Sequence, residues 1–183
     1  MRGPVTWPAA LGLAVVAAVL AGCGPSLAQR QALRATRYAT TDTTIVVAMT
    51  KALADARYRL GALRDTEVVA QIVYYRDNGT ALRRETGDLS PNLPFGQGLD
   101  RVYGVVMVGR LAGISDARRV EFVPRVWLYR PGTVPMPLDP DDQQRPTWLE
   151  GHVDQLHRSL RERLRPYVIA EPPADAPAVA PAS

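Results

Sequence analysis

The chain has 183 residues, and its 22 lysines and arginines exceed its 18 aspartates and glutamates, which gives a formal net charge of +4. A surplus this small gives weak support to nucleic-acid binding, and we expect no nucleic-acid partner. The single cysteine excludes a disulfide within the chain, and the length predicts one domain that can bury its own core.

The first residues have the features of an export signal. Arg2 supplies a positive charge, and residues 9–20 form an apolar run of roughly a dozen residues, shorter than the ~20 that cross a bilayer. The residues that close this run are Leu20, Ala21, Gly22 and Cys23. These four residues resemble a bacterial lipobox, in which the chain is cut before the cysteine.

The resemblance implies that residues 1–22 are a signal peptide and that Cys23 carries a covalent lipid, with no other cofactor expected. The alternative is an ordinary secretory signal that ends at Cys23. Lipidation is favoured because a single cysteine would otherwise be a free thiol in an oxidising compartment. Gly24 rather than aspartate follows the cysteine. In Gram-negative lipoproteins, a residue other than aspartate after the lipidated cysteine implies anchoring in the outer membrane. We expect the domain to lie on the periplasmic side of that membrane.

In two segments that flank the domain, apolar residues do not recur at the spacing of a helix or a strand. We interpret residues 23–33 as a tether after the lipidated cysteine, and residues 170–183, which are rich in proline and alanine, as a disordered tail. The single domain then spans residues 34–169.

A helix over residues 42–57 is the first element expected inside the domain. Thr41 or Asp42 can cap its first turn with a side-chain oxygen, and apolar residues recur at three- and four-residue spacing. A short strand over residues 58–62 follows, in which arginine alternates with apolar residues.

A hairpin is expected next. Residues 67–76 are rich in β-branched and aromatic side chains, and Asp77-Asn78-Gly79 favours a tight turn. Residues 80–86 would form the returning strand. Residues 87–99 have the composition of a loop.

Two longer strands are expected in the middle of the domain. Residues 101–111 are apolar enough to be central in a sheet, and residues 118–130 alternate between an apolar and a polar face. Pro124 lacks an amide hydrogen, so it marks a bulge or an edge position within the second of these strands.

The last helix is expected after a proline-rich loop over residues 131–146. Thr147 and Glu150 match the capping-box pattern, and a leucine-rich stripe continues to Leu164, before Pro166 ends the helix. The opposite, solvated face of this helix is expected to carry Glu150, Asp154, Arg158, Arg161, Glu162 and Arg165. The order of helix, strands and helix predicts an α+β fold: an antiparallel sheet of about four to five strands with two helices packed on one face.

A second resemblance concerns the start of the domain. The segment Thr36-Arg37-Tyr38-Ala39-Thr40-Thr41-Asp42, followed by Val47-Ala48, Ala52-Leu53 and Tyr58, resembles the opening of a group of uncharacterised proteobacterial lipoproteins. In that group a TR-aromatic-x-T-x-D segment precedes a helix, strands follow, and an amphipathic helix comes last. This chain has Arg57 before Tyr58, where the group usually has glycine. The resemblance implies an outer-membrane lipoprotein and carries no activity.

Residues that could support catalysis or bind a metal do not combine into a motif. His152 and His157 lie five apart on the last expected helix, a spacing that points them to different faces. The aspartates around Asp141 lack the glycine and glutamate of a calcium loop, and no serine has the G-x-S-x-G context of a hydrolase. We therefore expect no metal, no catalytic residue and no enzyme activity.

Two surfaces are candidates for contact with a partner. Exposed aromatic residues beside arginine are enriched in interfaces, which points to Arg125, Trp127 and Tyr129 on the polar face of their strand. The alternative is that the following loop or a helix covers them. Several arginines could form a basic surface for lipid headgroups or an acidic partner: Arg83, Arg84, Arg118, Arg119, Arg158, Arg161, Arg163 and Arg165. The alternative is a solvated face, in which these arginines are interleaved with Glu85, Glu121 and Glu162.

An anchor, a tether and a domain without a catalytic motif favour a non-catalytic envelope lipoprotein that binds a protein partner in assembly, transport or maintenance. The alternative is a lipoprotein that holds a lipid or another amphiphile between its sheet and helices. A large cavity under the helices would favour the alternative. A filled core with an exposed aromatic patch or a bare sheet edge would favour the protein partner.

Overall fold

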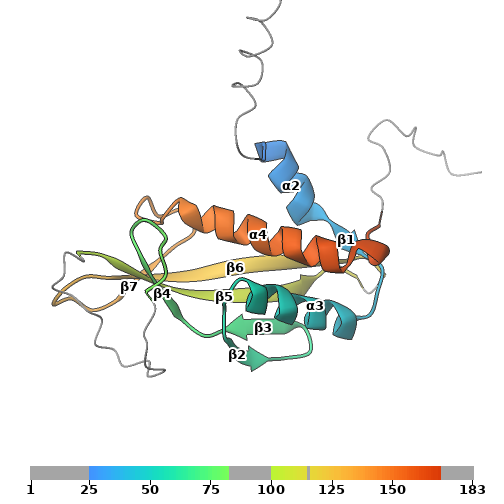
Figure 1. Cartoon of the computed structure of the whole chain (residues 1–183), viewed down its shortest axis with the longest axis horizontal. Coiled ribbons are helices and arrows are strands. Elements are labelled where there is room, and N and C mark those ends of the chain that lie inside the picture. Colours follow the sequence, from blue (N-terminus) through green and yellow to red (C-terminus); the bar gives the residue numbers. More distant parts are fainter. Residues whose placement is uncertain (1–24, 83–99, 115, 170–183) are drawn as a thin grey trace, which may run out of the picture.

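The computed structural model describes residues 25–82, 100–114 and 116–169 (Figure 1). Its elements in chain order are α2 (Leu27–Ala35), β1 (Arg37–Tyr38), α3 (Asp42–Asp55), β2 (Leu60–Leu63), β3 (Glu67–Ala70), β4 (Val73–Arg76), β5 (Val102–Ala112), β6 (Arg118–Tyr129), β7 (Met136–Leu138), α4 (Trp148–Arg163) and the short 3₁₀ helix η1 (Arg165–Tyr167). The expected signal peptide, Cys23, the loop over residues 87–99 and the tail over residues 170–183 lie outside the described residues.

An antiparallel sheet of seven strands forms one layer, with five strands in the main order β1-β6-β5-β3-β2. β4 also pairs with β5, and β7 pairs with β6. The predicted α+β class is confirmed, because the described residues form three α-helices that contact this sheet. The sheet has more strands than the expected four to five for two reasons. β1 and β7 are too short to show the alternation of apolar and polar residues that predicts a strand, and one expected strand is divided into two.

The divided strand is the one expected over residues 67–76, which forms β3 and β4. Val69 pairs with Val108 and Val73 pairs with Val105, so three intervening residues of this segment oppose two residues of β5. One extra residue in an antiparallel pair is a β-bulge, which bends the strand. The hydrophobic composition of this segment does not reveal such a break.

The turn after β4 forms as predicted. Gly79 has a φ of 81°, and the amide of Arg76 donates to the carbonyl of Thr80 at 2.9 Å across the turn. Of the expected returning strand, Ala81 forms an isolated bridge with Tyr75. Residues 83–86 lie outside the described residues.

β5 and β6 form the long central pair of the sheet and are in register along its length. Pro124 is opposite Met107 in this ladder. The other side of Pro124 is a local edge, because β1 and β7 pair with β6 only near its two ends. There Arg145 donates a hydrogen bond to the carbonyl of Pro124 at 3.2 Å. The predicted edge position is therefore confirmed, and the ladder has no bulge at this residue.

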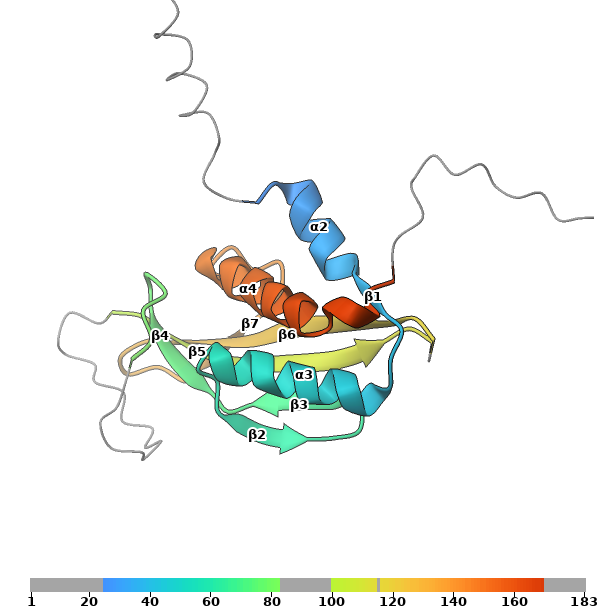
Figure 2. The ribbon, with the colours of Figure 1, turned by 45° about the vertical axis from the view of Figure 1, so that its right-hand side comes forward.

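α3 and α4 lie on the same face of the sheet (Figure 2). The side chains between the helices and the sheet form the core. Completely buried side chains in this layer include Ile45, Met49 and Leu53 of α3, Leu156 and Leu160 of α4, and Met107 of β5. A second buried cluster includes Tyr75, Tyr103, Val126, Leu128 and Leu149. The two clusters fill the space that an amphiphile would need between the sheet and the helices.

α3 begins at one of the two predicted caps. The hydroxyl of Thr41 accepts a hydrogen bond from the amide of Thr44 at 3.3 Å, while Asp42 pairs with Arg118 of β6, Nε to Oδ1 at 2.8 Å. Two residues beyond the helix, Arg57 has a φ of 64°. Glycine adopts this left-handed conformation at the lowest cost.

α4 forms with the predicted leucine stripe, but its predicted cap is wrong. Thr147 has helical backbone angles, with φ of −67° and ψ of −27°, and its side chain makes no capping hydrogen bond. A capping side chain reaches the first free amides from an extended backbone. Glu150, the other half of the expected capping box, instead accepts a hydrogen bond from Arg34 of α2 at 2.7 Å.

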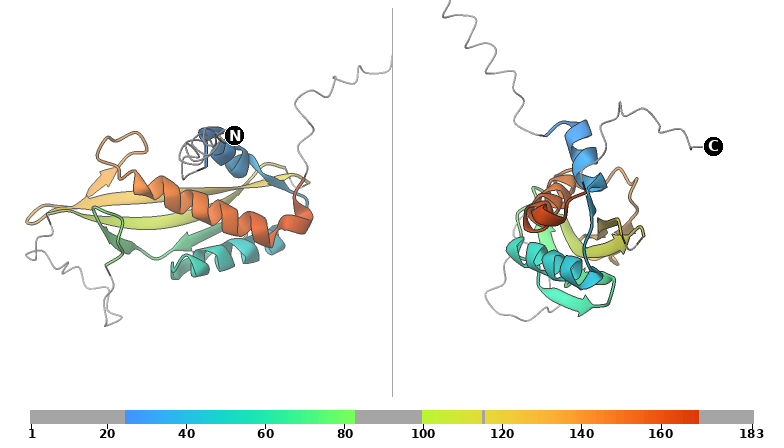
Figure 3. Two further views of the ribbon diagram at one scale, coloured as in Figure 1. Left: turned by 45° about the horizontal axis from the view of Figure 1, so that its top comes forward. Right: turned by 90° about the vertical axis from the view of Figure 1, so that its right-hand side faces the viewer.

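The segment interpreted as a tether contains a helix that the sequence interpretation missed. At the start of α2, the hydroxyl of Ser26 accepts from the amide of Gln29 at 3.2 Å, and the Gln29 side chain accepts from the amide of Ser26 at 2.8 Å. These two bonds form a complete capping box, and the Ser-x-x-Gln pattern was the signal available. No residue of α2 is buried. α2 lies beside α4, away from α3 (Figure 3).

Candidate functional site

The sheet face opposite the helices carries the aromatic residues that the sequence singles out. Val126 and Leu128 of β6 point into the core, so the residues between and beside them point to the other face. Arg125, Trp127 and Tyr129 therefore lie together on that face. Arg125 is exposed, and the two aromatic side chains are half-buried. α3 and α4 pack on the opposite face, so neither of these two helices covers the aromatic residues.

Close packing fixes the aromatic side chains. Tyr74 of β4 meets Tyr129 edge to face, with ring centroids 5.4 Å apart and ring planes at 77°. Gly104 of β5 leaves room for them, since a Cβ atom there would lie 2.7 Å from the Tyr129 ring and 2.8 Å from Cδ1 of Ile72. The four side chains of Ile72, Tyr74, Trp127 and Tyr129 are called the aromatic face below.

Charged residues on this side of the sheet differ in how they are paired. Arg110 of β5 pairs with Glu67 of β3, Nε to Oε2 at 2.8 Å, and Arg119 pairs with Glu121 on β6. Arg125 has no acidic partner within 4.0 Å among the residues that the structure describes. An unpaired guanidinium therefore lies next to the aromatic face.

The hydroxyl group of Tyr129 is protonated at neutral pH. Burial, together with the neighbouring Tyr74, raises the pKa of Tyr129 to about 12. A protonated phenol can both donate and accept a hydrogen bond. Aromatic residues and arginine are enriched in protein interfaces.

The two histidines of α4 have separate surroundings. The ring centroid of His152 lies 5.3 Å from that of Tyr75 and 5.1 Å from that of Trp148. His157 is buried against the Phe122 ring at 5.1 Å, and burial lowers its pKa to about 4. Within residues 25–82, 100–114 and 116–169, no three histidine, cysteine, aspartate or glutamate residues lie close enough together to hold a metal ion.

Asp154 is the polar residue that the sequence interpretation placed wrongly. We expected it on the solvated face of the last helix, but it is 3% exposed. A nitrogen of the Arg34 guanidinium donates to Oδ1 of Asp154 at 2.6 Å, and Nε of Arg30 lies 3.5 Å from its Oδ2. No side chain of α2 is completely buried, and its ion pairs with Asp154 and Glu150 connect it to α4.

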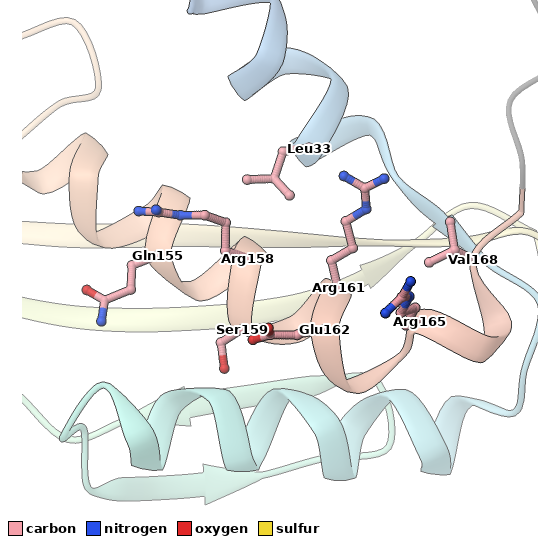
Figure 4. Close-up of a pocket in the computed structure, with 8 residues that line it drawn as sticks. All are labelled: Leu33, Gln155, Arg158, Ser159, Arg161, Glu162, Arg165 and Val168. Carbon is pink, nitrogen blue, oxygen red and sulfur yellow. The ribbon is translucent and has the colours of Figure 1, made fainter. Parts of the chain in front are cut away.

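A groove of about 870 Å³ lies on the outer side of α4, near the end of α2 (Figure 4). Arg158, Arg161 and Arg165 line it, together with Leu33 of α2 and Val168. Basic side chains on this helix were one of the two candidate surfaces in the sequence. The groove is not the cavity between sheet and helices that the amphiphile alternative requires.

The lipobox residues Leu20, Ala21, Gly22 and Cys23 lie outside the described residues, and their assignment stays a prediction. Of the helices that the structure describes, none is both long and apolar enough to span a bilayer. No known protein family matches the chain, and no curated protein matches it.

Proposed function

We propose that the protein is a non-catalytic lipoprotein of the bacterial envelope, anchored through Cys23 on the periplasmic side of the outer membrane, that binds a protein partner through its aromatic face. The observation that carries the proposal is the aromatic face itself, which neither α3 nor α4 covers. The solvated face of an antiparallel sheet is ordinarily polar. An apolar surface on that side therefore supports a binding function.

The filled interior favours a protein partner over an amphiphile held between sheet and helices. Met107, Leu156 and Leu160 are completely buried at the centre of that layer. Sites for small ligands are ordinarily preformed cavities with an apolar lining. An amphiphile would have to displace core side chains, whereas a protein partner can contact the half-buried side chains of the aromatic face.

Cys23→Ser should abolish lipidation and release the domain from the membrane. Permanent attachment requires more than one acyl chain, and Cys23 is the residue on which we place them. Cells are grown with a labelled fatty acid, and the isolated chain is assayed for label. We expect label on the wild type and on the control variant Ser26→Ala, and none on Cys23→Ser. Equal label on Cys23→Ser and the wild type would refute the anchor.

A photo-crosslinking amino acid at position 127 should trap the partner in intact cells. Lys51, an exposed residue of α3, provides the matched control position on the helical side. We expect a discrete adduct from position 127 and no such adduct from position 51. Trp127→Ala should weaken binding of the trapped partner by roughly 30-fold, as expected for an aromatic residue that dominates an interface. Adducts of equal yield at both positions would contradict the role of the aromatic face.

A further inference from the structure

We infer that the groove on the outer side of α4 binds the phosphate headgroup of an anionic phospholipid. This inference rests on the proposed function, because the lipid anchor brings the domain to a membrane surface. It adds a second contact with the membrane, made by side chains rather than by acyl chains.

Three arginines supply the charge of the groove. Arg158, Arg161 and Arg165 are exposed and follow one another at three- and four-residue spacing along the C-terminal part of α4 and the start of η1 (Figure 4). Glu162 is the acidic residue of the lining, so the groove has an excess of two positive charges. None of the three arginines has an acidic partner within 4.0 Å in the part of the chain that the structure describes.

Helix stability explains this grouping only in part, because a single acidic residue, Glu162, lies at three- and four-residue spacing from two of the arginines. Like charges three and four residues apart repel and destabilise a helix. The helix dipole favours cations only in the last turn, which contains Arg161 but not Arg158 or Arg165. A bound anion would relieve the repulsion among all three.

Two acidic residues nearer the start of α4 are already paired with an arginine of α2. Asp154 and Glu150, nearer the start of α4, both bind Arg34 of α2. Arg163, which lies between two of the groove arginines in sequence, pairs instead with Asp55 of α3. Charged side chains of α4 therefore form ion pairs with α2 and α3. The three arginines that line the groove form none with the residues that the structure describes.

Apolar side chains at the groove favour a phospholipid over a free anion. Leu33 and Val168 are half-buried and border the arginines in Figure 4. Guanidinium groups bind phosphate oxygens through paired, charge-assisted hydrogen bonds. Leu33 and Val168 can contact the carbon atoms next to the phosphate, a contact that inorganic phosphate does not offer.

The position of α2 keeps the groove close to the anchor. Three residue steps separate Cys23 from Ser26, which caps α2, and Leu33 is in the last turns of that helix. At ~3.5 Å per extended residue and ~1.5 Å per helical residue, Leu33 lies within roughly 25 Å of the lipidated residue. A headgroup of the same membrane is within reach of the groove arginines.

Native mass spectrometry of the full chain tests the inference. The protein is released from micelles of a neutral detergent doped with either phosphatidylglycerol or phosphatidylcholine. We expect the wild type to retain phosphatidylglycerol. The combined variant Arg161→Gln and Arg165→Gln should bind it about 30-fold more weakly, since each arginine near an anionic surface contributes roughly a factor of five. Phosphatidylcholine should bind weakly to both proteins.

The matched control combines Arg59→Gln and Arg76→Gln, which removes the same charge from exposed residues outside the groove. It should bind phosphatidylglycerol as the wild type does. An equal loss in this control, or equal binding by all three proteins, would overturn the inference. Inorganic phosphate that raises the melting temperature of the wild type alone, without retention of phosphatidylglycerol, would assign the groove to a free anion and would also overturn it.

The lipid-binding experiment and the tests of the proposed function can fail independently of each other. Lipid retention by purified protein requires neither the protein partner nor a change at Cys23. If lipid retention fails while labelling depends on Cys23 and crosslinking depends on position 127, the groove inference alone is wrong.

Discussion

Leu156→Ala and Leu160→Ala should each lower the free energy of unfolding by about 2–5 kcal/mol. Both side chains are completely buried where α4 packs against α3 and the sheet. Truncation of a buried leucine loses its transfer free energy and leaves a cavity that the neighbours fill only in part. Urea unfolding followed by circular dichroism measures the difference.

Gln155→Ala is the matched control for these two variants. Gln155 is exposed on the same helix, so its substitution should change stability by no more than about 0.5 kcal/mol. If the leucine variants kept wild-type stability, α4 would not be an integral layer of the domain. A loss of similar size in Gln155→Ala would instead indicate a disturbance of the helix itself.

The second large effect is a loss of stability at acid pH that depends on His157. Burial, and to a lesser extent the charge of Arg34, lowers the pKa of His157 from its ordinary value of 6.5 to about 4, while Asp154 and Glu121 act in the opposite direction. Between these two values the unfolded chain binds a proton at this residue and the folded chain does not. Stability therefore falls as the pH falls from about 6.5 to 4, by about 3 kcal/mol in total.

His157→Gln isolates this contribution. The variant has no titrating group at position 157, so the part of the pH dependence that belongs to His157 should disappear. Carboxylates titrate in both proteins, and the difference between the two stability curves from pH 7 to pH 4 therefore measures His157 alone. The prediction is wrong if the two curves stay parallel over this range.

The elements with a long apolar period could be predicted from the sequence, and the short ones could not. α3, α4, β5 and β6 extend over at least eleven residues each and lie close to their expected ranges. β1 and β7 have two and three residues and form because β6 offers an edge to pair with. Such pairing depends on residues distant in the chain and leaves no local pattern.

The surroundings of Asp154 show why the candidate site could be predicted only in part. Its spacing along the helix places Asp154 on the polar face of α4, so the sequence predicts that its side chain is exposed to solvent. Arg34, which covers it, lies 120 residues away along the chain. The grouping of Arg125, Trp127 and Tyr129 was predictable because alternation along one strand determines it, whereas contact between two helices is decided by tertiary packing.

The free edges of the sheet determine how copies of the protein could associate. β1, Pro124 and β7 together leave β6 little free edge, and Arg145 already occupies the carbonyl of Pro124. At the other end of the main order, β2 is exposed at all four of its residues, and no described strand pairs with its outer side. Two copies could therefore join by pairing their β2 strands. Growth beyond such a pair would have to use the outer sides of β1 and β7, which have two and three residues, and edge strands this short disfavour continuous edge-to-edge association.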